Sequence, residues 1–213
     1  MAQARVHAIE AQVDVADALK FLGHRGQLMD AELEGSVNSI TEEVNGLQPR
    51  GLWQAFPIAK TSGEGVQLQG TALFLPGSHI ARHLDGAREA VLMAVTLGAD
   101  SERLLKRSAC ISATDGLIAD ACASSLVEEA ANGISRLVAE EAQAQGLRAG
   151  KRFSPGYGDF PHSAQGDFLR AIGAEKLLGS RLTEGDLMVP TKSITAVIPL
   201  FDEEAERESH GHA

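Results

Sequence analysis

The sequence predicts a mixed fold in which helices and strands follow one another along the chain. The longest periodic segment, residues 115–145, repeats apolar side chains at helical spacing. Alternating apolar residues between Trp53 and Leu75 are typical of half-buried strands, and the apolar run from Ala90 to Val95 is typical of a fully buried strand. These three stretches favour a domain that contains both kinds of element.

Composition limits both the size and the partners of the protein. The chain has 213 residues, of which 44% are hydrophobic and 23% are charged, in the range of one moderate domain or two small ones. No internal repeat or clear linker divides it, so we expect residues 1–201 to form a single domain and 202–213 to form a flexible acidic tail. The formal net charge of -10 argues against nucleic acid or an anionic membrane as a partner, because both would repel the chain.

The N-terminal residues carry no targeting signal of the secretory kind. Residues 1–10 mix acidic, basic and polar side chains and lack the apolar stretch of a signal peptide. No run of about eighteen apolar residues occurs in the sequence. We therefore expect a cytoplasmic protein without a membrane span.

Capping and turn residues mark the elements of the N-terminal half. Asp14 can cap a short helix that closes at Gly23, and an apolar stripe over 33–44 marks a second helix that stops at Asn45-Gly46. Residues 63–65 predict a hairpin turn between two strands. Ser78 can cap a brief helix over 79–84.

The C-terminal half is richer in helix. We expect helices over 101–111 and 115–145, followed by a basic, glycine-containing connector at 147–151. A further helix starts near Ser163, and a short one ends at Gly179. Alternation over 194–198 predicts a half-buried strand.

Candidate metal ligands are few. His79 and His83 stand at i, i+4 spacing, but without the glutamate of an H-E-x-x-H motif this signal is poor. Cys110 and Cys122 lie in predicted helices, where free cysteine usually behaves as a small core residue, with a disulfide or metal role as the alternative. No phosphate-binding or dinucleotide-binding glycine motif occurs.

The loop from Arg152 to Pro161 combines a fixed cation with glycines, prolines and aromatic rings. Pro155 restricts the backbone, whereas Gly156 and Gly158 permit positive φ and let a ligand approach the main chain. Arg152 adds a planar fork of donors that suits a carboxylate or a phosphate. Taken alone, the same residues also fit a tight surface turn.

One face of the 115–145 helix carries small residues around a single carboxylate, Glu128. Solvated helix faces usually carry long charged side chains, so we expect close packing there, either by another helix or by a ligand. The small residues are Ala121, Ser124, Ser125, Ala131, Asn132 and Ser135.

The order Arg152, three residues, Gly156-Tyr157 resembles the R-x-x-x-G-Y motif of the activation domain of cobalamin-dependent methionine synthase, which binds S-adenosylmethionine (AdoMet). The resemblance to that family, including its freestanding members, extends in order over about residues 13–201. It implies an α+β fold, a bent antiparallel β-sheet with packed helices. The segments that carry it are 18–23, 96–98, 126–128, 152–161 and 189–194.

The resemblance also implies roles for individual residues. Arg152 would bind the carboxylate of AdoMet, and Glu128 would hold its ammonium group. Tyr157 would face the cobalt side of a docked corrinoid, which makes it the expected catalytic position, and Asp14 would be another acidic contact. The implied ligand-binding set is Asp14, Glu128, Arg152, Phe153, Ser154, Pro155, Gly156 and Tyr157.

The charges of the ligand agree with this set. AdoMet is a zwitterion with an added sulfonium, so its site needs a cation for the carboxylate and a carboxylate for the positive groups. Methyl transfer from a sulfonium to a reduced corrinoid needs no general base, and the protein contributes positioning. The set assigns no metal ligand.

The chain lacks the D-x-H-x-x-G motif with which the multidomain synthase binds cobalamin, since Asp159 and His162 have a different spacing. The resemblance therefore implies that the corrinoid arrives on another protein. It also implies that this chain, a component of a methyltransferase of methionine biosynthesis, is not active alone on homocysteine.

The leading hypothesis is a reactivation subunit that binds AdoMet and supports reductive methylation of cob(II)alamin on a separate corrinoid-carrying methionine synthase. A flavodoxin-like or other reductant would supply the electron. The alternatives are an AdoMet-binding module for another corrinoid methyltransferase, an AdoMet sensor without catalysis, and an interaction protein whose loop has lost its ligand.

Overall fold

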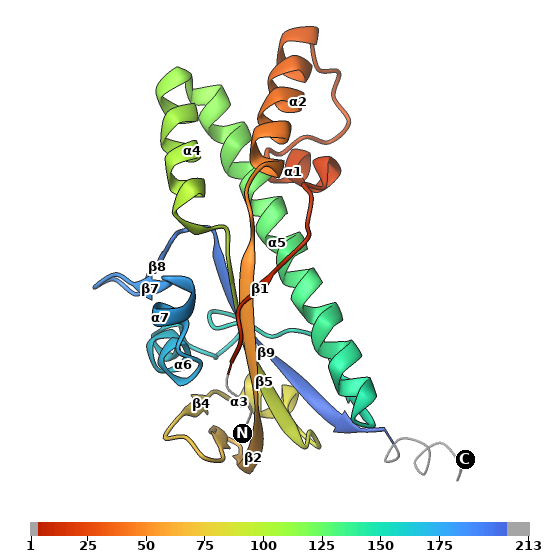
Figure 1. The fold of residues 1–213 in the computed structure, drawn as a ribbon, viewed down its shortest axis with the longest axis vertical. Helices are drawn as coiled ribbons and strands as arrows, with labels where there is room; N and C mark the ends of the chain where they lie inside the picture. Colours follow the sequence, from red (N-terminus) through yellow and green to blue (C-terminus); the bar gives the residue numbers. More distant parts are fainter. Residues whose placement is uncertain (1–3, 204–213) are drawn as a thin grey trace.

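The core of the protein is a curved antiparallel sheet of seven strands (Figure 1). The structure is a computed structural model and describes residues 4–203. The sheet order is β4-β3-β2-β5-β9-β6, with β1 paired to the start of β2. Its strands are β1 (His7–Ala8), β2 (Arg50–Ser62), β3 (Gly65–Leu68), β4 (Phe74–Pro76), β5 (Glu89–Thr96), β6 (Leu147–Ala149) and β9 (Ser193–Asp202). A separate hairpin pairs β7 (Arg181–Leu182) with β8 (Met188–Val189).

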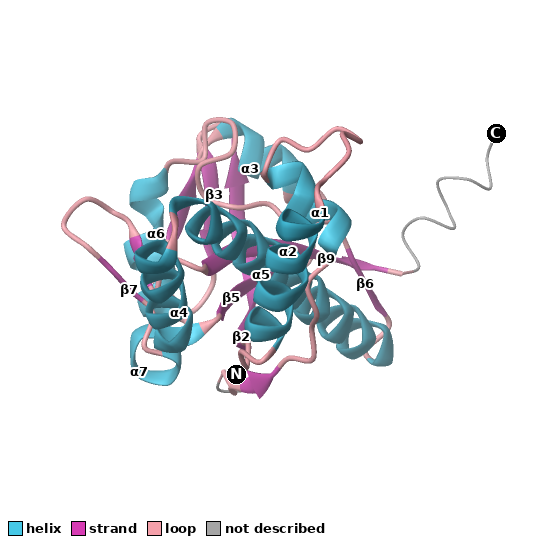
Figure 2. Cartoon of the chain, turned by 90° about the horizontal axis from the view of Figure 1, so that it is seen from above, coloured by secondary structure: helices cyan, strands magenta, loops and turns pink. Residues whose placement is uncertain are grey.

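Helices cover both faces of this sheet. Figure 2 shows α5 flanked by α2 and α4, and α1, α2 and α4 all pack against it. The shorter helices α3, α6 and α7 share a second core with the opposite face of the sheet. The helices are α1 (Val15–Phe21), α2 (Ala31–Asn45), α3 (Ser78–His83), α4 (Gly98–Ile111), α5 (Ala113–Ala144), α6 (Gln165–Ala171) and α7 (Ala174–Leu178). A 3-10 turn, η1 (His162–Ala164), precedes α6.

Strand β5 is buried on both faces, which explains its continuous apolar run. Because successive side chains of a strand point to opposite faces, odd and even residues join different cores. Val91, Met93 and Val95 belong to the core that contains α5, whereas Ala90, Leu92 and Ala94 belong to the core that contains α6 and α7. The sheet is thus the middle layer between two sets of helices.

Two glycines let the backbone approach α5 closely. A Cβ on Gly51 of β2 would lie 2.1 Å from Cδ1 of Ile134, which is far inside contact distance. A Cβ on Gly133 of α5 would lie 2.8 Å from Cγ2 of Ile9, in the extended segment that follows β1. The long helix is therefore held between β2 and the N-terminal segment.

The α+β prediction is confirmed, because the sheet is antiparallel throughout and helices pack on its faces. Local signals located the first two helices well: Asp14 caps α1, and α2 ends at Asn45 with Gly46 as its C-cap. The predicted turn at 63–65 joins β2 to β3. The apolar run from Ala90 to Val95 lies within β5.

Other predictions need correction. The N-cap of α3 is Gly77, and Ser78 is the first helical residue, because Asp159 takes the capping role. The helix expected from residue 101 begins at Gly98, and the expected connector at 147–151 contains β6. The first residue of the expected tail, Asp202, ends β9, and residues 204–213 of that tail lie outside the described residues.

The two cysteines behave differently. Cys122 is a buried core residue on α5, as expected, and burial raises the pKa of its thiol. Cys110 is exposed near the end of α4, so the prediction of a core role for it was wrong. Both are free thiols. Across residues 4–203, no helix combines the length and the apolar character needed to cross a membrane.

Replacing Leu126 with alanine tests the central role of α5. Leu126 is 0% exposed in the core beneath this helix, so Leu126→Ala removes buried methyl groups and leaves a cavity. We expect the free energy of unfolding to fall by about 2 to 5 kcal/mol. Urea unfolding followed by the fluorescence of Trp53, the one tryptophan of the chain, measures the loss.

Leu117→Ala is the matched control on the same helix. Leu117 is 64% exposed, so we expect a change of less than about 0.5 kcal/mol. Equal losses in the two variants would contradict the assignment of this face of α5 to the core.

Candidate functional site

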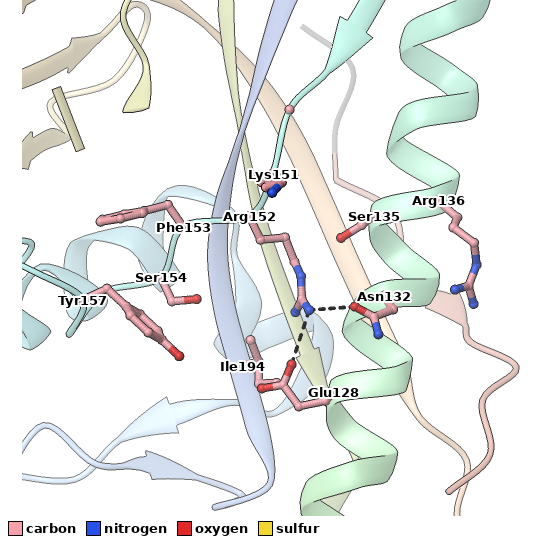
Figure 3. Close-up of a pocket in the computed structure, with 11 residues that line it drawn as sticks. Glu128, Asn132, Ser135, Arg136, Lys151, Arg152, Phe153, Ser154, Tyr157 and Ile194 are labelled. Carbon is pink, nitrogen blue, oxygen red and sulfur yellow. Dashed lines mark hydrogen bonds and ion pairs between the residues drawn. The ribbon is translucent and has the colours of Figure 1, made fainter. Parts of the chain in front are cut away.

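A cavity of about 560 Å³ lies between the middle of α5 and the loop that follows β6. Figure 3 shows the residues that line it, with Glu128, Asn132 and Ser135 of α5 facing the loop that carries Arg152. The helix contributes Glu128, Asn132, Ser135 and Arg136. The loop contributes Gly150, Lys151, Arg152, Phe153, Ser154 and Tyr157, and β9 contributes Ile194.

Arg152 and Glu128 meet inside this cavity. Nη2 of Arg152 lies 3.3 Å from Oε2 of Glu128 and donates a hydrogen bond of 2.7 Å to Oδ1 of Asn132 (Figure 3). The Arg152 side chain is 22% exposed and that of Glu128 is 50% exposed, so the pair lies at the boundary of protein and solvent. A residue on the loop and two on the helix therefore form one polar cluster.

The spacing of the helix residues explains why they gather. Glu128 and Asn132 are four residues apart on α5, so they lie one above the other on the same face. Ser135 continues this face by one more turn, and its hydroxyl donates to the carbonyl of Ala131. This face of α5 points toward β9 and the loop, and the small side chain of Ser135 leaves room there for the cavity.

Backbone hydrogen bonds hold the loop against β9. The N–H of Phe153 donates to the carbonyl of Val197 at 2.9 Å, and the N–H of Val197 donates back at 2.8 Å. The N–H of Gly150 donates to the carbonyl of Pro199 at 2.8 Å. Arg152 lies between these two attachment points, so the start of its side chain is fixed by the sheet.

The turn after Arg152 depends on two glycines. Gly156 has φ of 97°, and a Cβ there would lie 2.4 Å from the ring of His162. Gly158 has φ of 59°, and a Cβ there would lie 1.9 Å from Nδ1 of His79. Both glycines have the positive φ that the sequence suggested. Histidine rings fill the space next to them, so this part of the main chain is not open to a ligand.

Asp159 ties the end of this turn to α3. Its Oδ2 accepts hydrogen bonds from the N–H and the hydroxyl of Ser78, both at 2.7 Å, and its Oδ1 accepts from the N–H of His79 at 2.9 Å. The hydrogen bonds from the N–H of His79 and from Ser78 hold the pKa of Asp159 well below its usual range. The charged form of Asp159 is therefore the one that the folded protein stabilises.

The small-residue face of α5 has two kinds of neighbour. Ser125 accepts from the N–H of Asp14 at 2.9 Å and donates to its carbonyl at 3.0 Å, so the N-terminal segment packs there. Lys192 donates to Ser124 at 2.8 Å and lies 2.8 Å from Oδ1 of Asp120. Only the following turns, with Asn132 and Ser135, line the cavity.

The structure brings together most of the expected ligand-binding residues. Glu128, Arg152, Phe153, Ser154 and Tyr157 all line the cavity. Tyr157 is 66% exposed, so its ring lies at the surface.

The three remaining residues lie outside the lining of the cavity. Pro155 is buried and Gly156 is exposed, and neither lines the cavity. Asp14 is the N-cap of α1, and its carboxylate accepts a hydrogen bond from the N–H of Asp17. Its side chain therefore serves the helix and does not line the cavity.

Four lining residues were not expected from the sequence: Arg136, Gly150, Lys151 and Ile194. Arg136 lies two turns after Glu128 on α5, so helical spacing from Glu128 was the available signal. Lys151 directly precedes Arg152, but a residue next to a predicted contact has no preferred direction until the loop conformation is known.

The paired histidines of α3 serve the loop. Nε2 of His83 lies 2.8 Å from the carbonyl of Lys151, and its ring lies 5.0 Å from that of Phe153. Nδ1 of His79 lies 3.7 Å from Oδ1 of Asp159. Within residues 4–203, no group of three or more histidine, cysteine or acidic residues is arranged to hold a metal ion.

Comparisons with known proteins establish the fold. The chain is similar to the structure of the MetH reactivation domain bound to S-adenosylhomocysteine (AdoHcy), with a TM-score of 0.66. The two chains share 17% sequence identity, and the match covers 94% of this chain and 79% of that chain. No family model and no curated protein sequence matches the chain. The likeness therefore shows a shared α+β fold, reached through a very different sequence.

The anchor between Asp159 and α3 predicts an acid-dependent stability. Because the folded state lowers the pKa of Asp159, its contribution is complete above the unfolded pKa of about 3.9 and is lost as pH falls below that value. We expect Asp159→Asn to lower the Tm at neutral pH, and the gap to wild type to shrink below about pH 4. Thermal unfolding at constant ionic strength between neutral and acid pH measures the gap.

Asp167→Asn is the control for this experiment, because Asp167 is exposed and, among the residues that the structure describes, pairs only with Arg170 of its own helix. We expect that variant to have a small effect on Tm. A gap for Asp159→Asn that stays constant or widens at acid pH would contradict the role of the carboxylate.

Proposed function

We propose that the protein binds AdoMet in the cavity between α5 and the loop after β6, and supports reductive methylation of a corrinoid on a separate methionine synthase. The observation that carries the proposal is the meeting of Arg152 and Glu128, 24 residues apart in sequence, at 3.3 Å inside one cavity. The likeness to a reactivation domain solved with AdoHcy supports the same conclusion.

The cluster has the charges that a zwitterion needs. The bonds of Arg152 to Glu128 and Asn132 both use Nη2, which leaves its other N–H groups without a partner among residues 4–203. A ligand carboxylate can accept from these groups, and a ligand ammonium can replace the guanidinium as the partner of Glu128. Binding then exchanges one ion pair for two.

The rest of the lining suits a nucleoside. Phe153, Tyr157 and Ile194 offer aromatic and aliphatic surface next to the polar cluster, and Ser135 and Ser154 offer hydroxyl groups. Such a mixture of apolar walls with a few polar groups is typical of small-molecule sites. The volume of about 560 Å³ falls within the usual range of about 300 to 1,000 Å³ for such sites.

The position of Tyr157 supports a role at a docking surface. Its ring lies 6.3 Å from that of Phe153 inside the cavity and is mostly exposed outside it. A docked corrinoid, reduced by a flavodoxin-like or other donor, would supply the nucleophile for the methyl group. The residues of this chain would hold AdoMet, keep water from its methyl group and present it beside Tyr157. The same proposal places the protein in the cytoplasm.

Arg152→Ala tests the ligand site. The variant leaves a ligand carboxylate without its cation in a partly desolvated cavity, so we expect AdoMet binding to weaken by about 2 to 4 kcal/mol. Calorimetric titration of AdoMet into the purified protein measures the change. Arg103→Ala is the control, because Arg103 is exposed on α4 and pairs within its own helix. Absence of AdoMet binding to the unmodified protein would overturn the proposal.

The partner is tested by capture from an extract of the source cells. We expect the immobilised protein to enrich a corrinoid-carrying protein, which the visible absorbance of the corrinoid identifies. Tyr157→Asp is the control bait, because a charge at this exposed ring should weaken docking. An AdoMet sensor would bind its ligand and enrich no corrinoid. Purified alone with AdoMet and homocysteine, the chain should form no methionine.

A further inference from the structure

The cavity carries more positive than negative charge, although the whole chain has a formal net charge of -10. Arg136, Lys151 and Arg152 line it, and Glu128 is the one carboxylate among its described lining residues. Arg152 and Glu128 offset one another. The side chains of Arg136 and Lys151 have no ion-pair partner within residues 4–203, so their charges are left over.

This surplus distinguishes between two ligands of nearly the same shape. AdoMet and AdoHcy have the same carboxylate, ammonium group and adenosyl group. AdoMet also has a sulfonium, which gives it a net charge of about +1, whereas the sulfur of AdoHcy is a neutral thioether. The carboxylate and ammonium ends offset Arg152 and Glu128 in both ligands. The sulfonium alone is left to face the surplus cations.

We propose that the cavity binds AdoHcy more tightly than AdoMet, and that Lys151, with a smaller share from Arg136, sets this preference. The inference rests on the proposed function, because it concerns the same cavity. Figure 3 shows Arg136 on the far side of α5 from Arg152. Arg136 also lines a neighbouring cavity that contains Glu10 and Glu129, and these carboxylates reduce its effect.

Aromatic rings are the main opposing influence, since a sulfonium can bind to a ring face. The ring of Phe153 already stacks on Phe160 at 6.3 Å and lies 5.0 Å from His83, which leaves Tyr157 as the more accessible ring. One exposed cation–π contact favours the cation by about two- to fivefold. If the sulfonium lies about 8 Å from the ammonium group of Lys151, the repulsion disfavours AdoMet by about two- to thirtyfold, depending on solvent exposure.

A preference for AdoHcy has a consequence for methyl transfer. Only an interaction that differs between the donor and its demethylated product changes their relative free energy in the site. The repelled charge is removed when the methyl group leaves, so Lys151 favours transfer by raising the free energy of bound AdoMet relative to bound AdoHcy. Arg152 and Glu128 hold both ligands by their shared ends and do not contribute to this difference.

Parallel calorimetric titrations of AdoMet and AdoHcy into the full chain test the inference. We expect AdoHcy to bind about three- to tenfold more tightly at low salt, with a smaller ratio at high salt because of screening. Lys151→Gln should tighten AdoMet binding and leave AdoHcy binding nearly unchanged, so that the ratio falls toward one. Arg136→Gln should lower the ratio of the AdoHcy affinity to the AdoMet affinity by less than Lys151→Gln does. Lys106→Gln, which removes an exposed charge on α4, should preserve the ratio.

The outcomes separate the inference from the proposed function. Equal affinities, or tighter binding of AdoMet, would overturn the inference and leave the proposed function standing. A preference for AdoHcy that survives in the Lys151→Gln, Arg136→Gln double variant would also overturn it, because the two charges would not be the cause. Failure of both ligands to bind the unmodified protein would overturn the proposed function itself.

Discussion

The close packing of α5 on the sheet is the constraint on which the site depends. Gly51 and Gly133 allow β2 and the N-terminal segment to approach the helix at distances that a Cβ would prevent. Buried residues such as Leu126 and Ile134 then fix the rotation of the helix about its axis. With that rotation fixed, Glu128 and Asn132 face the loop, and the distance between α5 and β9 determines the width of the cavity.

The residues of the cavity satisfy part of one another's electrostatic and hydrogen-bonding needs. Arg152 pairs with Glu128 and hydrogen-bonds to Asn132, so neither charge is left alone in a half-buried place. Under the proposed function, a zwitterionic ligand would have to separate this pair before it could bind either partner, so the net gain would be smaller than two new ion pairs suggest. The same pair holds the guanidinium of Arg152 in the cavity, which would reduce the entropy lost on binding a ligand there.

Elements with local signals could be predicted from the sequence, and elements that depend on distant partners could not. The caps of α1 and α2 and the apolar run of β5 lie in contiguous residues. Strands β1 and β6, of two and three residues, exist only through pairing with β2 and β9 and have no pattern of their own.

The site follows the same division. Arg152 and Glu128 were expected from a motif and from an isolated carboxylate on a small-residue face. The hydrogen-bond partner of Ser78 could not be predicted in this way, because Asp159 lies 81 residues further along the chain. Lys151 and Arg136 line the cavity because of the loop conformation and the rotation of α5, which no local pattern encodes.

Contacts made outside the cavity determine the shape of the loop. Gly156 and Gly158 fit against His162 and His79, Asp159 holds the N-terminus of α3, and Phe153 pairs with β9. Since these contacts come from three separate elements, the loop is held from several directions at once. A change at any of them would move Arg152 and Tyr157 without altering the charges of the site. The fold therefore sets the geometry of the site from outside, while Arg152, Glu128 and Lys151 supply charged groups to its lining.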